Sequence, residues 1–310
     1  AAYSVRQLIS SQTRSLRVQR LTGGGTGDAD EADVLFGSAT EISLDSPINN
    51  VSTGVTATTL GEFFNATGYS NPDSLPAVAG ITGQVADWYD QTANGNNASQ
   101  SVSGSMPSIF DGTSASTLIQ DNGKPAVQFD GVNDNLLHAV SGLTSGNFTY
   151  VDTFNSSDTA ALLHSSNSGN TKWVMISQTS TSTALSDGFV TSWGSYYKNG
   201  TLPLLSSATR TDLQNAFFNG SQNLAFYNGT TSGTAVANLY LGRYYSGGLE
   251  FSGKLQESIL YTSDQSSNRT GIETNVNTFY SIYNGASTSG FLFDYPGAAT
   301  AYSVRQLGNG

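Results

Sequence analysis

Short segments in which apolar and polar residues alternate recur along most of the chain. Such alternation has the two-residue period of a β-strand that buries one face. Gly, Asn, Asp or Ser bounds most of these segments, and a series of strands separated by turns predicts a β-sandwich or a barrel. The predicted strands are residues 16–21, 85–90, 125–131, 148–154, 172–178, 188–194, 216–221, 224–229, 237–242 and 253–261.

The local sequence adds detail to these strands. In the first of them, Leu16 and Val18 are expected to point inward and Arg17 and Gln19 outward. Asn-Gly pairs accept positive φ and therefore predict turns or hairpins. These pairs lie at residues 94–95, 199–200, 219–220 and 228–229.

One segment departs from the strand period. Ile272, Val276, Phe279 and Tyr283 recur at intervals of four, three and four residues, which is the spacing of one helix face. Asp264 is the expected N-cap, and the helix is expected to end at residues 284–285, an Asn-Gly pair. This pattern predicts one helix that lies across an edge or a face of the sandwich.

Composition indicates a polar β-protein with few charged residues, and it narrows the classes of function. The chain has 310 residues, of which 37% are hydrophobic and only 11% are charged. Its net charge of −11 argues against nucleic acid as a partner, because that affinity depends on basic side chains that neutralise phosphates. No window approaches the ~18 apolar residues that a membrane span needs. The lack of cysteine excludes disulfides, a thiolate nucleophile and cysteine-ligated zinc.

Four motifs carry a resemblance to a known family: AYSVRQL (2–8), ADWYDQTANGNNASQ (86–100), MPSIF (106–110) and NGKPAVQFDGVNDNL (122–136). Together they resemble a module of bacteriophage structural proteins that is similar to concanavalin A-like (LamG-type) jelly rolls. The module is also distantly similar to the catalytic domain of B-class α-L-arabinofuranosidases. The resemblance implies an all-β jelly-roll sandwich over residues 1–284 with one short C-terminal helix. It further implies a virion-surface or extracellular location, with other copies of the chain or other virion proteins as partners.

The heptapeptide AYSVRQL occurs twice, at Ala2–Leu8 and at Ala301–Leu307. The first copy is expected to pair as a strand within its own domain. Residues 285–300 are interpreted as a linker, which Pro296 stiffens by fixing its own φ. The resemblance implies that residues 301–310 begin a second like module, as in a tandem repeat, or an assembly segment. The alternatives are that they stay disordered or add to the sheet edge of a neighbouring subunit.

The loop FDGVNDN brings the side-chain oxygens of Asp130, Asn133 and Asp134 close together in sequence. A hard cation such as Ca²⁺ takes several oxygen ligands at about 2.3–2.6 Å, so these residues are candidate calcium ligands. Their spacing is not that of an EF-hand. The alternative is a hairpin turn in which the same side chains bond local backbone amides. In either case Asp130 and Asp134 are expected to hold the loop.

A glycosidase needs two carboxyl groups about 5–9 Å apart. The resemblance implies a carboxylate on a central strand and an Asp just after NLYLG, but RYYSGG follows here and the next acid is Glu250. Asp152 has no established correspondence, and Glu257 is expected to face solvent or anchor a loop. His138 and His164 lack a metal-ligand or Ser-His-Asp context. We therefore expect no catalytic residues and no enzymatic activity, with a glycoside hydrolase as the alternative.

Aromatic residues near the ends of predicted strands are candidate glycan-binding residues. Jelly-roll lectins place aromatic rings against sugar faces, and an uncharged, Tyr-rich surface suits that use. Alternatively these rings pack in the core or against a neighbouring subunit, with one ring of each Tyr-Tyr pair pointing outward. The candidates are Trp193, Tyr196, Tyr197, Tyr244 and Tyr245.

Together these observations favour a non-enzymatic component of a virion or surface appendage, such as a fibre, a tail or a capsid decoration. Host cell-surface glycans are its candidate ligands. An assembly scaffold without any ligand is a further alternative.

Overall fold

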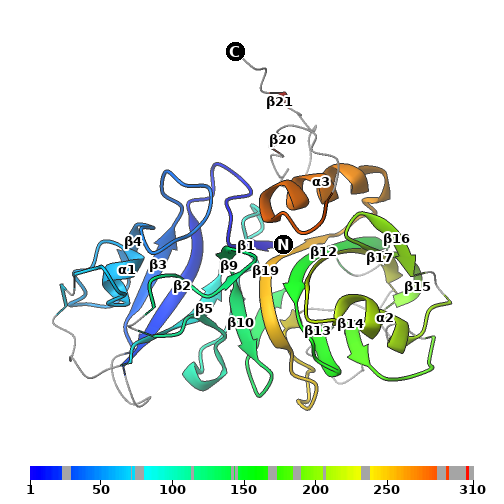
Figure 1. The fold of residues 1–310 in the computed structure, drawn as a ribbon, viewed down its shortest axis with the longest axis horizontal. Helices are drawn as coiled ribbons and strands as arrows, with labels where there is room; N and C mark the ends of the chain where they lie inside the picture. The colour runs from blue at the N-terminus through cyan, green and yellow to red at the C-terminus, as the bar shows by residue number, and fades with distance from the viewer. Residues whose placement is uncertain are drawn as a thin grey trace.

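The structure is a computed structural model, and it places most of the chain in strands. It describes residues 1–22, 29–70, 72–73, 80–112, 115–140, 143, 146–166, 173–183, 190–204, 207–231, 238–284, 291–292 and 305–306. Within these ranges, seventeen strands join one large antiparallel sheet that curls into a sandwich (Figure 1). The expected all-β sandwich with a helix near the C-terminus is confirmed.

The first layer of the sandwich runs in the order β16–β15–β17–β12–β19. Along the other edge of β19, β10 pairs with its first residues and β1 with its last ones. The strands are β1 (Ala2–Ser4), β10 (Val127–Asp130), β12 (Asn147–Asn155), β15 (Val190–Lys198), β16 (Thr201–Leu204), β17 (Gln222–Thr231) and β19 (Ser252–Tyr261).

The second layer runs in the order β14–β13–β18–β11–β6. Its strands are β6 (Ala98–Ser99), β11 (Leu136–Ala139), β13 (Ala160–Ser166), β14 (Trp173–Gln178) and β18 (Asn238–Leu241). Strand β6 continues into an N-terminal wing of order β5–β2–β3–β4, and β7 links β5 to β10. These strands are β2 (Arg14–Leu21), β3 (Glu31–Leu35), β4 (Ile48–Asn50), β5 (Thr82–Trp88) and β7 (Ser108–Phe110). The wing thus joins both layers.

The core fills the space between the layers, and β12 shows why. Successive side chains of a strand point to opposite faces. Phe148, Tyr150 and Phe154 of β12 are buried on one face, which packs toward the second layer. On the other face, Val151 lies opposite Ile259 of β19, and both are buried. Both faces of the first layer are therefore covered.

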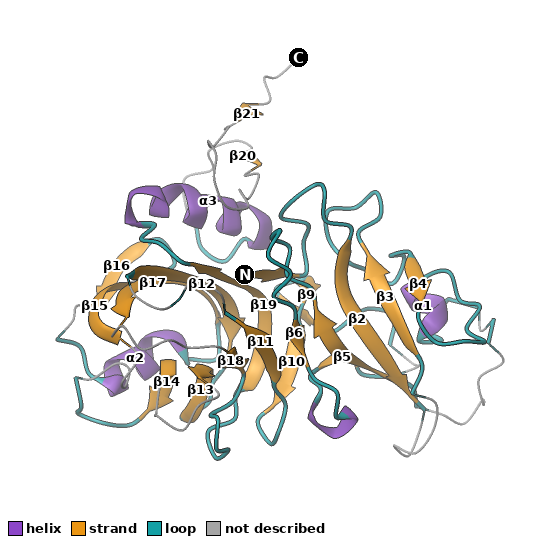
Figure 2. Ribbon diagram, turned by 180° about the vertical axis from the view of Figure 1, so that it is seen from behind, coloured by secondary structure: helices purple, strands orange, loops and turns teal. Residues whose placement is uncertain are grey.

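Within the described residues, three α-helices and two 3₁₀ turns lie around the sheet (Figure 2). They are α1 (Leu60–Phe63), α2 (Arg210–Phe217), α3 (Arg269–Tyr280), η1 (Ser103–Ser105) and η2 (Ser266–Asn268). Capping boxes at Thr59–Glu62 and Thr209–Asp212 begin α1 and α2. None of the helices in the described ranges is long and apolar enough to cross a membrane.

The predicted strand at residues 216–221 is wrong. Ala216 and Phe217 end α2, whose Thr209–Asp212 capping box sets the helical conformation from its first turn. Within the described residues, each of the other predicted strands overlaps a β-strand. The turn predicted at residues 228–229 is also wrong, because this Asn-Gly pair lies inside β17, whereas Asn199 and Gly200 adopt positive φ between β15 and β16.

Helix α3 is shorter than predicted. The prediction of Asp264 as its N-cap is wrong, because the N-cap is Asn268. The carboxylate of Asp264 accepts a hydrogen bond from the amide of Ser266 at 2.9 Å, and the 3₁₀ turn η2 lies between Asp264 and the helix. Ser281 adopts the left-handed conformation and ends it. The fully buried aromatic residue of its last turn is consequently Tyr280, and Tyr283 lies beyond the helix.

On β2, Leu16 and Val18 are buried as expected, and Arg17 is half-buried. Gln19 is buried rather than outward. Gln19 shares the strand face of Arg17, and it is buried because that face is covered at this point, where the hydroxyl of Ser103 donates to the Gln19 side chain. The prediction for Gln19 was therefore wrong.

Little of the C-terminal region lies within the described ranges. Strand β20 (Phe291–Leu292) pairs with β21 (Arg305–Gln306) in a separate two-residue ribbon. A second small ribbon is formed by β8 (Gln120–Asp121) and β9 (Lys124–Pro125). Pro296 lies outside the described residues. The linker at residues 285–300 and the second module stay predictions.

Candidate functional site

The first copy of the repeated heptapeptide is built into the sandwich as a strand. β1 pairs with residues 257–259 of β19, as expected for a strand that pairs within its own domain. The Ala2 amide donates to Asp90 Oδ1 at 2.9 Å, and the Ala2 carbonyl accepts from the Gln91 amide at 2.8 Å. Strand β1 is therefore held from the side of β19 and from the turn that follows β5.

Gln91 holds the rest of the heptapeptide through its side chain. Its Nε2 donates to the carbonyls of Ser4 and Arg6 at 3.0 and 2.9 Å, and its Oε1 accepts from the Leu8 amide at 2.7 Å. Gln91 is fully buried, so these bonds satisfy polar groups that have no access to water. We call the set formed by Asp90, Gln91 and residues 256–260 the N-terminal dock.

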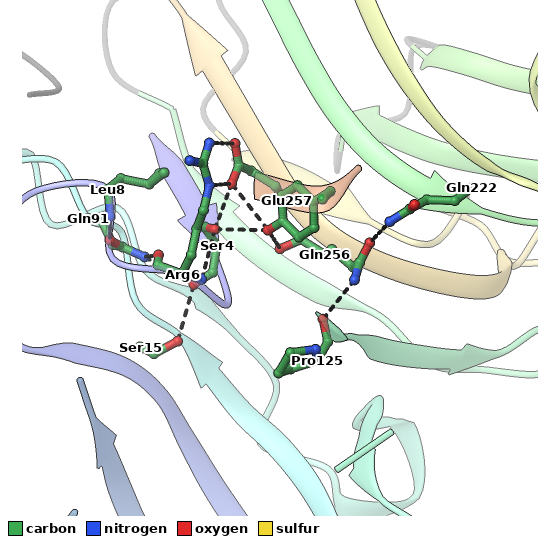
Figure 3. A network of polar contacts seen from close by, with 10 residues as sticks. Ser4, Arg6, Leu8, Ser15, Gln91, Pro125, Gln222, Gln256 and Glu257 are labelled. Atoms are coloured by element: carbon green, nitrogen blue, oxygen red, sulfur yellow. Dashed lines mark hydrogen bonds and ion pairs between the residues drawn. The ribbon is translucent and has the colours of Figure 1, made fainter. Parts of the chain in front are cut away.

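A buried ion pair lies at the centre of this dock (Figure 3). Arg6 Nε and Nη2 donate to the two carboxylate oxygens of Glu257 at 2.7 and 2.9 Å, and the two side chains are 9% and 0% exposed. Ser4 Oγ donates to Glu257 Oε2 at 2.8 Å, and the Tyr280 hydroxyl donates to the same oxygen at 3.3 Å. Two side chains of the heptapeptide thus converge on one carboxylate.

The carboxylate of Glu257 offsets the cost of burying the Arg6 guanidinium. Burial alone lowers the pKa of Arg6, but the charge and the hydrogen bonds of Glu257 outweigh it and raise that pKa above its ordinary value. The Arg6 guanidinium also lies over the rings of Phe279 and Tyr280, 5.1 and 5.7 Å from their centroids. Helix α3 therefore covers the pair.

The expectation that Glu257 faces solvent is wrong. Glu257 lies opposite Thr153 on β12 and opposite Ser4 on β1, so its side chain points to the sheet face that α3 covers. The sequence could not show this, because Arg6 is 251 residues away along the chain. The one available signal was that AYSVRQL and LQES both alternate as strands do, so that the two segments could pair.

Asp152 belongs to a second buried polar cluster on the other face of β12. Its Oδ2 lies 3.0 Å from His164 Nε2 and accepts a hydrogen bond from the Tyr227 hydroxyl. Tyr150 stacks on His164 with a centroid distance of 4.4 Å. All four side chains are within 1% of complete burial, so the cluster joins the two layers inside the sandwich.

The carboxylates that the sequence singled out do not form a pair. Asp152 and Glu257 point to opposite faces of the first layer, because Asp152 lies opposite Ser258 and not opposite Glu257. Glu250 lies in the turn before β19, where its carboxylate accepts from the Gly248 amide at 2.9 and 3.0 Å. His138 is buried, and burial lowers its pKa to about 3. These side chains have structural partners instead of a common site.

The candidate glycan-binding residues are divided between the core and the surface. Tyr196 is buried and stacks on Tyr227 at 5.2 Å, so the core alternative holds for it and it offers no ring to a sugar. Tyr197 is half-buried, and the guanidinium of Arg269 lies 4.0 Å from its ring centroid. Trp193 lies on β15, but its side chain is outside the described part of the chain.

Tyr244 and Tyr245 follow β18 and are both half-buried. Their rings meet edge to face, with centroids 4.7 Å apart. Both belong to the turn of residues 243–248 and not to a regular strand, so the two rings can share one side of the chain. Of the candidates whose side chains the structure describes, this pair is the one best placed to present aromatic surface.

The loop after β10 is held by hydrogen bonds within the chain. Asp130 Oδ1 accepts from the amides of Val132 and Asn133 at 2.8 and 3.3 Å, and Asp134 Oδ2 accepts from the Asp130 amide at 2.9 Å. Burial, followed by the nearby charge of Asp130, raises the pKa of Asp134 to about 7. This is the geometry of the hairpin alternative. In the described residues no group of three His, Cys, Asp or Glu side chains is arranged for a metal ion.

A surface pocket of about 400 Å³ was not predicted from the sequence. Residues 115–120 line it together with Asp111, Gln128 and Lys254. The Lys254 ammonium donates to the Gln120 carbonyl at 2.7 Å and is therefore already engaged. The pocket offers a polar recess beside the start of β19.

The fold and these contacts are the basis for any functional assignment. Searches against protein-family models, curated proteins and solved structures find no significant match.

Proposed function

We propose that the chain is a non-enzymatic structural module of the concanavalin A-like type that serves on a virion or another extracellular surface appendage. Such a module would belong to a fibre, a tail or a capsid decoration. Its partners are other copies of itself or other virion proteins, with host cell-surface glycans as ligands and neither nucleic acid nor a membrane among its partners.

The observation that carries this proposal is the buried pair of Arg6 and Glu257. The acidic residue that the sequence offered to a hydrolase serves as the anchor of the N-terminal strand. The anchored heptapeptide is also the one that recurs at residues 301–307. The chain therefore holds one dock and two copies of the segment that fits it. This arrangement suits a protein whose modules are joined in series.

Glycan binding is assigned to the turn that carries Tyr244 and Tyr245. An edge-to-face pair of half-buried rings supplies apolar surface beside polar backbone, which suits a sugar face. Tyr197 is a weaker candidate, because the guanidinium of Arg269 already lies over its ring. The turn after β18 is therefore the ligand surface of the proposal.

A glycan array probed with the full chain tests this assignment. We expect retention of a restricted group of glycans, and we expect Tyr245→Ala to abolish it. Tyr197→Ala is the matched control, and its binding should equal that of the parent. If the folded parent binds no glycan, the proposed glycan ligand is refuted, and the remaining hypothesis is an assembly scaffold without a ligand. If Tyr197→Ala and Tyr245→Ala lose binding equally, the site is misplaced.

A further inference from the structure

The N-terminal dock selects its strand through side chains as well as through the backbone. Main-chain pairing alone would accept many sequences. Here Glu257 is fully buried and is bonded by Arg6 and Ser4 of the docked segment. A strand without the arginine would leave a buried carboxylate unpaired, which is strongly unfavourable. The dock is therefore specific for a segment with serine and arginine two residues apart.

The chain contains a second segment that meets these requirements. Ala301–Leu307 is identical to Ala2–Leu8 at every position, so Ser303 and Arg305 correspond to Ser4 and Arg6. The residue before the heptapeptide also pairs with the dock, because the Ala1 nitrogen donates to the Leu260 carbonyl at 3.2 Å and the Ala1 carbonyl accepts from the Leu260 amide at 2.9 Å. Thr300, which precedes the second copy, carries the same backbone groups.

We propose that the N-terminal dock of one chain binds residues 301–307 of a second copy of the same chain. Arg305 then pairs with Glu257 of the receiving copy, and Ser303 donates to the same carboxylate. The contact is head-to-tail, so repetition gives a ring or an open filament. The inference rests on the proposed assembly of like modules and specifies how two copies are joined.

The competing contacts decide when this exchange occurs. In the structure Arg305 and Gln306 pair with Phe291 and Leu292 in a two-residue ribbon, and so small a ribbon adds little stability. The stronger competitor is Ala2–Leu8 of the receiving copy, because its covalent attachment gives it a high effective concentration at the dock. Exchange is therefore expected chiefly when the N-terminal copy has left the dock.

Charge reversal at Arg6 in the full chain tests the proposal. Arg6→Glu places two carboxylates together and expels the N-terminal copy, so Glu257 becomes available to Arg305 of another chain. Sedimentation velocity should show concentration-dependent oligomers of R6E and a monomeric R6E/R305E variant. The variant R6E/E257R restores the pair within one chain and excludes Arg305, and it should be monomeric as well.

Synthetic peptides keep the test decisive if R6E is poorly folded. TAYSVRQL should raise the melting temperature of the R6E/R305E variant, whereas TAYSVEQL should not. An R6E chain that stays monomeric and a variant that TAYSVRQL does not stabilise would overturn the proposal. Oligomers of R6E that persist in R6E/R305E would also overturn it. Glycan binding and turnover are measured in separate experiments. If the head-to-tail contact is refuted, the proposed function is therefore still tested by those experiments.

Discussion

Arg6 and Glu257, which are 251 residues apart along the chain, form a two-point ion pair that α3 and its aromatic residues cover. Removing one member of a buried pair leaves the other charged group without a partner. We expect Arg6→Ala to lower the free energy of unfolding by about 3–5 kcal/mol in urea titrations. Arg14→Ala is the control, because Arg14 is half-exposed and 3.4 Å from Asp33, and it should cost about 0–1 kcal/mol. Equal losses in both variants would contradict a structural role for the pair.

Asp152 holds the two layers of the sandwich through His164 and Tyr227. Asp152→Ala would leave those buried groups without their acceptor. We expect it to destabilise the protein by about 1–3 kcal/mol for each of these groups that loses its bond to Asp152. Asp45→Ala is the control, because Asp45 is exposed and accepts from Tyr69 at 2.6 Å. Urea denaturation that shows no larger loss for Asp152→Ala than for Asp45→Ala would refute this role.

Asp134 makes stability depend on pH in the mildly acidic range. Burial raises its pKa in the folded state to about 7, so the folded protein binds the proton more tightly than the unfolded chain does. Its contribution to stability is complete below the unfolded pKa of about 4 and is lost as the pH rises toward 7. Asp134→Asn keeps an acceptor for the Asp130 amide and removes the charge. Melting temperatures of this variant should fall less than those of the parent between these pH values, and parallel curves would contradict the assignment.

The loop after β10 depends on the carboxylate of Asp130. Asp130→Ala removes the acceptor for the amides of Val132 and Asn133, and we expect a loss of about 1 kcal/mol, measured by urea denaturation. EDTA should leave the melting temperature of the parent unchanged if the amides alone hold the loop. A chelator effect that matches the Asp130→Ala loss would instead establish the calcium alternative. If Asp130→Ala is as stable as the parent, both the hairpin and the calcium alternatives are refuted.

The sequence predicted most of the strands because their alternation is local. It failed at residues 216–221, where an apolar run looks alike in a strand and in the last turn of a helix. The signal that distinguishes them, the capping box of Thr209 and Asp212, lies at the start of the same helix, before the apolar run. Helix α3 was predicted, but its ends were not, because a 3₁₀ turn separates Asp264 from the actual N-cap, Asn268, and because the left-handed Ser281 ends the helix.

The candidate site was less predictable than the fold. Whether a strand carboxylate faces water or the core depends on what covers that face, and α3 and β1 cover Glu257 from opposite ends of the chain. The same reason separates Tyr196, which lies under the stacked rings of the core, from Tyr197, its outward neighbour. Such partners are set by tertiary packing, which a single sequence does not display.

The most direct test of the account asks whether Glu257 is an anchor or a catalytic acid. Turnover of an aryl α-L-arabinofuranoside and stability in urea should be measured together for the full chain and for Glu257→Gln. We predict no turnover by either protein and a loss of about 3–5 kcal/mol in Glu257→Gln, because Arg6 loses its buried partner. Turnover by the parent that Glu257→Gln abolishes at unchanged stability would contradict the account.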